Sequence, residues 1–222
     1  RYVFGIDPAS EVDKFSLSII EMHEDHRRIV YVWSTNKKEF NEKLKRGLVH
    51  ETDYYGYCAR KIRDLMKKFP CERIMLDSQG GGIAVNEALH DKDKLKDGEL
   101  PLWPIIVPGE YKETDGEEGL HVIELVNFAD AKWVVEANHG MKKDMEDKVL
   151  LFPYFDSISL GMAAIQDTNG NLLYDTLEDC LLEIEELKNE LSTIIHTQTQ
   201  YGRDRWDTPE IKIAGNKKGR SR

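Results

Sequence analysis

"RIMLDSQGGG" (residues 73–82) joins an apolar run to an aspartate and then to three consecutive glycines. Residues 72–77 have the short apolar pattern of a buried strand, and "GGIAVNEALH" (81–90) has a helical pattern. Asp77 therefore ends a strand, and after Ser78 and Gln79 come three glycines, which have no side chains. A carboxylate in this position, beside a backbone that can approach a ligand closely, indicates a binding site at the edge of a sheet.

Three strands and a helix are predicted upstream of this stretch. The strands cover residues 2–6, 14–22 and 27–36. Short polar turns join them, so we expect an antiparallel meander whose first strand ends at Asp7. From Thr52 onward the apolar residues recur at helical spacing, which predicts a helix that ends at Pro70. Because the helix leads into the strand at 72–77, it is a crossover that sets this strand parallel to the first.

The downstream half has weaker patterns. We expect an edge strand flanked by prolines at 100–108, a polar loop at 109–119 and a mostly helical region at 120–147. A short apolar stretch at 148–153, an amphipathic helix at 176–191 and a strand or hairpin at 194–209 should follow. The whole order predicts an α/β domain of the ribonuclease H-like fold, in which a mixed sheet is flanked by helices.

Length and composition bound the function. A chain of 222 residues with 40% hydrophobic residues can bury one sizeable core, so we expect a single domain over residues 1–222. It has no apolar run of membrane-spanning length and no signal-peptide pattern, which predicts a soluble chain without a membrane partner. The three cysteines are scattered, which argues against a disulfide framework or a structural zinc site built on thiolates.

The net charge of −10 by itself argues against a nucleic-acid partner. A metal-dependent nuclease can nevertheless be acidic, because its carboxylates hold the cations that contact phosphate. The seven histidines are also scattered, and the sequence assigns no role to His139 or His196.

Asp7 and Asp77 are the candidate metal ligands. Each ends a strand, and the predicted fold places these two strands side by side and parallel. Two carboxylates so close repel each other unless a cation lies between them, and Mg²⁺ or Mn²⁺ prefers such oxygen ligands. Two ions about 3.5–4 Å apart can activate a water and stabilise the leaving oxygen of a phosphodiester.

Gly80, Gly81 and Gly82 would then let a helix start approach a phosphate backbone. Simpler interpretations exist for each feature alone. An aspartate after a strand often caps a helix or forms a turn, and a glycine run often makes a tight loop.

Several stretches together resemble the nuclease domain of the large terminase subunit of tailed bacteriophages. They are "FGIDPASEVDKFSLSIIE", "IVYVWS", "YCARKIRDLMKKF", "IMLDSQGGGIAVNEAL" and "VLLFP", within residues 2 to about 209. The resemblance implies a ribonuclease H-like, Mg²⁺- or Mn²⁺-dependent endonuclease that cuts concatemeric viral DNA. It makes Asp7 the first metal ligand and Asp77 the second, and it suggests Asp13 as an accessory acidic residue.

A third acidic ligand is expected from the same resemblance, after a final strand and a basic stretch. This chain stops in the basic stretch, so we expect that ligand beyond Arg222, with Asp207 and Asp204 as the alternatives within the chain. The basic side chains of this stretch are candidate DNA phosphate contacts without sequence specificity. They are Lys217, Lys218 and Arg220.

The implied partners are double-stranded DNA, an ATPase motor domain in the same polypeptide, the portal, the capsid and the small terminase subunit, in the host cytoplasm. The chain is therefore expected to be the C-terminal part of a larger terminase. No GxxxxGK[ST] motif occurs in it, so we expect no ATP hydrolysis by this segment.

Three other functions fit parts of the sequence. Holliday-junction resolvases share the fold and clustered carboxylates, and would prefer branched DNA. An actin-like or sugar-kinase-type ATPase also has a strand ending in a phosphate-binding turn, but Pro8 and Ala9 stand where small flexible residues are needed. A non-catalytic module that docks the motor to the portal or capsid would use the acidic helix at 177–191.

Overall fold

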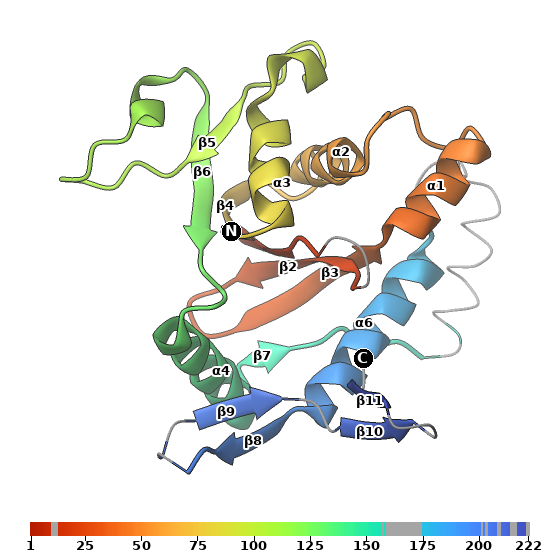
Figure 1. The fold of residues 1–222 in the computed structure, drawn as a ribbon, viewed down its shortest axis with the longest axis vertical. Coiled ribbons are helices and arrows are strands. Elements are labelled where there is room, and N and C mark those ends of the chain that lie inside the picture. The colour runs from red at the N-terminus through yellow and green to blue at the C-terminus, as the bar shows by residue number, and fades with distance from the viewer. Residues whose placement is uncertain are drawn as a thin grey trace. The chain divides into compact units, whose positions relative to one another are not determined.

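The computed structural model describes residues 1–9, 13–156, 158, 175–200, 202, 204–207, 210–213 and 217–220 (Figure 1). The chain divides into two compact units, Arg1–Phe128 with Val149–Pro153, and Ala129–Lys148 with Tyr154–Arg222. The single domain predicted over residues 1–222 stays a prediction. Among the described residues, no helix is both long and apolar enough to cross a membrane.

The first unit is built on a seven-stranded sheet. Its strands are β1 (Tyr2–Asp7), β2 (Phe15–Met22), β3 (Arg27–Thr35), β4 (Cys71–Asp77), β5 (Leu102–Pro104), β6 (Leu120–Val126) and β7 (Leu150–Leu151). The strand order is β5-β6-β4-β1-β2-β3-β7. β1, β2 and β3 form the predicted antiparallel meander, while β4 is parallel to both β1 and β6. The predicted α/β, ribonuclease H-like fold with a mixed sheet is confirmed.

Helices complete this unit. They are α1 (Lys37–Lys45), α2 (Tyr54–Met66), α3 (Gly81–His90) and the short 3-10 turns η1 (Lys92–Lys94) and η2 (Glu113–Gly116). α2 is the crossover between β3 and β4, and α3 packs beside it (Figure 1). The side chain of Asp53 caps α2 by accepting the Gly56 N–H at 2.6 Å.

The core lies where the alternating strands meet the helices. On β2, Phe15, Leu17 and Ile19 are buried while Ser16 is exposed, as the period of two predicts. The apolar side chains of the neighbouring strands and of α2 are buried with them. They are Phe4, Ile6, Ile74, Leu76, Tyr54, Cys58, Ile62 and Leu65. This buried layer holds the ends of β1 and β4 in fixed positions.

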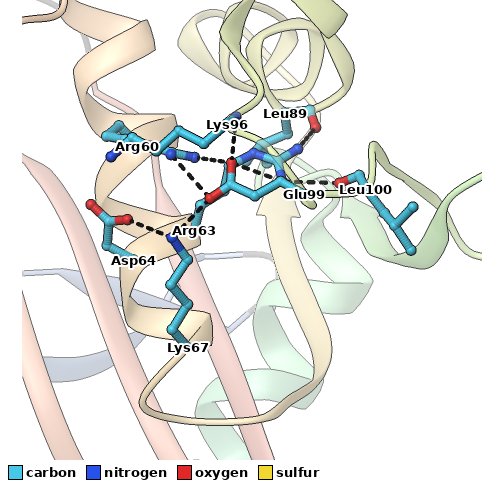
Figure 2. A network of polar contacts seen from close by, with 8 residues as sticks. All are labelled: Arg60, Arg63, Asp64, Lys67, Leu89, Lys96, Glu99 and Leu100. Carbon is cyan, nitrogen blue, oxygen red and sulfur yellow. Dashed lines mark hydrogen bonds and ion pairs between the residues drawn. The ribbon is translucent and has the colours of Figure 1, made fainter.

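Two arginines of α2 are also buried, which the helical pattern did not reveal. Arg60 donates both Nη atoms to Glu99, at 3.1 and 2.6 Å (Figure 2). Glu99 also contacts Lys67 Nζ at 3.0 Å and accepts the Lys96 N–H at 3.1 Å. Glu99, which lies in the segment that follows α3, therefore neutralises the buried positive charge of α2.

Arg63 makes the second part of this network. Its guanidinium donates to the carbonyl oxygen of Leu89 in α3 and, at 2.9 Å, to that of Leu100 (Figure 2). The exposed fraction of its side chain is only 6%. Arg63 thus joins α2 to the C-terminal end of α3, the helix whose N-terminal end adjoins Asp77.

Residues 120–147, predicted as mostly helical, contain β6 before the helix α4 (Ala131–Glu146) begins. The prediction was wrong for 120–126 because β6 lies between β4 and β5, where sheet pairing decides the conformation. Helix α1 was not predicted. Its signal is local, since the Asn36 side chain accepts the Glu39 N–H at 2.9 Å as an N-cap.

The second unit contains α4, α6 (Leu177–Thr193), β8 (Ile195–Gln198), β9 (Asp204–Asp207), β10 (Glu210–Ile213) and β11 (Lys217–Arg220). α6 confirms the helix predicted at 176–191, and a capping box between Thr176 and Asp179 starts it. β8 and β9 form an antiparallel hairpin, as expected after residue 194. β10 and β11 form a second antiparallel pair, which the sequence did not predict.

Candidate metal centre

Asp7 and Asp77 end neighbouring parallel strands. The register pairs Ile6 of β1 with Leu76 of β4, so the next residue on each strand is one of these aspartates. Asp77 is in turn paired with Val126 at the end of β6. The structure therefore brings both carboxylates to one edge of the sheet, as the sequence predicted, while their role as metal ligands stays a prediction.

The backbone next to Asp77 makes a short hydrogen bond, whereas the Asp77 carboxylate makes only long ones. The N–H of Ser78 donates to the Val126 carbonyl at 2.7 Å, which ties the end of β4 to the end of β6. Asp77 Oδ1 accepts the N–H groups of Gln79 at 3.3 Å and Phe128 at 3.4 Å. Both distances exceed the usual 2.7–3.2 Å of such bonds, so these contacts compensate the negative charge only weakly.

Asp13 lies near enough to join the electrostatics of this pair. Partial burial, the Asp77 carboxylate and the Asp13 carboxylate, in that order, raise the pKa of Asp7 above its ordinary value. Asp7 is nevertheless exposed to solvent and Asp13 is exposed too, so an ion has access. A carboxylate whose charged form is disfavoured by two neighbouring carboxylates fits a hard divalent cation, which relieves the repulsion by supplying positive charge.

The three glycines have two different roles in the structure. A Cβ at Gly81 would lie closer than 3.0 Å to the Pro8 carbonyl oxygen, and a Cβ at Gly82 would meet the Asp77 carbonyl oxygen. These two glycines therefore let α3 pack directly on the ends of β1 and β4. Gly80 has a φ of +53° and faces open space, so glycine is favoured there by the backbone conformation and not by close packing.

The N-terminal end of α3 consequently adjoins the carboxylates. The positive end of its helix dipole favours a negatively charged ligand at this edge of the sheet. The approach of a DNA phosphate to Gly80, Gly81 and Gly82 stays a prediction, since packing against the strands already explains two of them.

The remaining predicted residues lie in the second unit. Asp207, on β9, accepts Arg205 Nη2 at 2.6 Å, and Asp204 contacts two histidines. Both stay alternatives for the third ligand. Lys217 and Arg220 bound strand β11, and the side chains of Lys217, Lys218 and Arg220 lie outside the described residues.

Among the described residues, one group of side chains could hold a metal ion that the sequence did not predict as a group, namely His139, His196 and Asp204. They come from α4, β8 and β9. The hairpin was predicted without its register, and that register places His196 opposite Trp206 and Asp204 opposite Gln198. His139 is 65 residues from Asp204 along the chain, so no spacing motif joins them.

Comparisons with known proteins give a structural likeness but no sequence match. No protein-family model and no curated protein matches the chain. Among solved structures, it is similar to the large terminase of bacteriophage HK97, with 13% sequence identity and a TM-score of 0.46. The match covers 93% of this chain and 35% of that terminase. The chain thus spans about a third of the length of the protein that it resembles.

Proposed function

We propose that this chain is the metal-dependent endonuclease domain of a viral DNA-packaging terminase. The observation that carries the proposal is the placement of Asp7 and Asp77 on adjacent parallel strand ends, with Asp13 close enough to raise the pKa of Asp7. The resemblance of "GIDPA" and "LDSQGGG" to terminase nucleases supports it at the same residues. In this role the domain would cut concatemeric double-stranded DNA.

Asp7 and Asp77 would hold Mg²⁺ or Mn²⁺, since all their ligand atoms are carboxylate oxygens. When bound, a pair of such ions supplies a water that is nucleophilic at neutral pH and positive charge next to the scissile phosphate. In support of this role, the end of β4 is tied to β6, and the Asp77 carboxylate accepts only two long hydrogen bonds from backbone N–H groups among the contacts described. Asp13 adds negative charge, and the N-terminal end of α3 favours an approaching phosphate.

The partners of a terminase belong to the same proposal. They are double-stranded DNA, an ATPase motor in the same polypeptide, the portal, the capsid and the small subunit, in the host cytoplasm. Because the net charge is −10, we expect weak DNA binding without divalent ions and much tighter binding with them.

The first test is cleavage of supercoiled plasmid in Mn²⁺, Mg²⁺ or EDTA. We expect metal-dependent nicking that falls at least about 100-fold in Asp7→Asn and Asp77→Asn, because even groups that only orient a metal ligand change activity about 10–100-fold. Asp97→Asn is the matched control, since Asp97 is an exposed aspartate of the same unit outside the site. Full activity of folded Asp77→Asn would refute the proposed site.

Two additions to this assay address the alternatives. A four-way junction compared with linear duplex separates a resolvase, which would prefer the junction, from a terminase nuclease. A version extended past Arg222 tests the predicted third ligand, because activity gained only on extension would place that ligand there. DNA binding with no cleavage by either version, over a full metal titration, would instead favour the docking module.

A further inference from the structure

His139, His196 and Asp204 converge within the second unit. His139 Nε2 lies 3.1 Å from Asp204 Oδ2, and His196 Nε2 lies 2.9 Å from Asp204 Oδ1. One ligand atom from each residue lies within 4.8 Å of the other two. The three side chains come from α4, β8 and β9, so the pairing of the β8–β9 hairpin and the packing of α4 on β9 bring two imidazole nitrogens to opposite oxygens of one carboxylate.

The spacing is close to what a transition-metal ion needs. A tetrahedral ion with bonds of about 2.05 Å holds its ligand atoms about 3.3 Å apart. The two histidine–aspartate distances are within a few tenths of an ångström of this value, and all three ligand atoms lie within 4.8 Å of one another. The exposed side-chain fractions are 47% for His139, 31% for His196 and 22% for Asp204. Solvent therefore reaches the centre, and water can complete the coordination.

The ligand types select the ion. Imidazole nitrogens suit Zn²⁺ and similar transition metals, whereas Mg²⁺ and Ca²⁺ prefer sites made of oxygen atoms alone. This donor set differs in kind from the carboxylates of Asp7 and Asp77. The two centres should therefore have different metal preferences.

Neighbouring side chains hold the histidine rings in place. The Trp206 ring stacks on His196, with centroids 4.3 Å apart and planes at 15°, and meets His139 edge to face at 5.3 Å. Gln198 Nε2 donates to Asp204 Oδ1 at 3.2 Å. Groups of this kind around the ligands orient them and reduce the loss of freedom on metal binding.

We propose that His139, His196 and Asp204 form a transition-metal site for Zn²⁺, with water as the remaining ligand, which fastens α4 to the β8–β9 hairpin. The proposal is independent of the nuclease function. The competing explanation is a clamp in which both histidines donate Nε2–H to Asp204 and no ion binds. The two explanations predict opposite results when Zn²⁺ or Co²⁺ is added.

The test uses the full chain without an affinity tag and carrying Asp77→Asn, which weakens metal binding at the carboxylate edge. Calorimetric titration with Zn²⁺ at neutral pH should show one tight site, and Co²⁺ should produce the visible absorption of nitrogen-bound cobalt, which Zn²⁺ then removes. We expect His196→Gln and Asp204→Asn to weaken Zn²⁺ binding at least about 10-fold. His50→Gln, at an exposed histidine of the other unit, should leave it unchanged.

A second measurement does not depend on how the variants fold. In the chain without substitutions at the cluster, Zn²⁺ should protect His139 and His196 from diethyl pyrocarbonate, as mapped by mass spectrometry, while His50 stays reactive. Absence of Zn²⁺ binding, or binding that survives both His196→Gln and Asp204→Asn, would leave only the hydrogen-bonded clamp. Neither result depends on DNA cleavage, so failure here leaves the nuclease proposal intact.

Discussion

Replacing Glu99 by glutamine should strongly destabilise the first unit. Glu99 has a side-chain exposed fraction of 10%, and the two guanidinium groups beside it, of Arg60 and Arg63, are 9% and 6% exposed. The shortest contact, Arg60 Nη2 to Glu99 Oε2, is 2.6 Å. Glu99→Gln preserves the shape of the side chain but leaves two buried positive charges without their carboxylate.

Removing one partner of a buried ion pair costs about 3–5 kcal/mol. We expect about 3 kcal/mol here, because glutamine keeps one acceptor oxygen and the third cation, Lys67, is 56% exposed and can be solvated. For a chain of this length, 1 kcal/mol changes Tm by about 2–4 °C, so Tm should fall by roughly 6–12 °C.

Urea unfolding and calorimetry of Glu99→Gln measure this directly. Glu72→Gln is the matched control, because the Arg1–Glu72 pair has exposed fractions of 75% and 53% and should contribute less than about 1 kcal/mol. If both variants lose the same stability, the argument from burial is refuted.

The pH dependence gives a second readout for Glu99. Burial raises its pKa, but the contacts with Lys67, the Lys96 N–H and Arg60 outweigh this and lower the pKa below its ordinary value of 4.5. A lowered pKa in the folded state means that Glu99 stabilises the protein above about pH 4.5 and loses this effect as pH falls through the folded-state pKa. In Glu99→Gln, the acid-induced loss of stability should therefore be smaller.

Two other predictions concern the candidate metal centre. Gly82→Ala places a Cβ against the Asp77 carbonyl oxygen and should cost about 1–3 kcal/mol in urea unfolding. Gly140→Ala, in the middle of α4 with open space around it, should instead stabilise by about 0.5–1 kcal/mol, and equal effects of the two substitutions would contradict the packing argument. Partial burial, Asp77 and Asp13 raise the pKa of Asp7 above 3.8, so folding stability falls as pH rises from that value through the folded-state pKa. Asp7→Asn should remove this loss and be more stable than the parent protein at pH 7. Lower stability of this variant at pH 7 would count against repulsion at the site.

The sequence by itself determined the features that depend on short-range patterns. The strand β2 and the helices α2 and α6 were predicted from residues within a few positions of each other. Asp7 and Asp77 could also be paired from the sequence, because a helical crossover sets β1 and β4 parallel and brings their ends to one edge.

Only the tertiary structure decided the features whose partners are distant along the chain. β6 was read as helix because its strand conformation depends on pairing with β4 and β5. The burial of Arg60 requires Glu99, 39 residues away, and the histidine cluster joins His139 to Asp204 across 65 residues. A buried charge or a ligand cluster is specified by which surfaces pack together, and local periodicity contains no information about that packing.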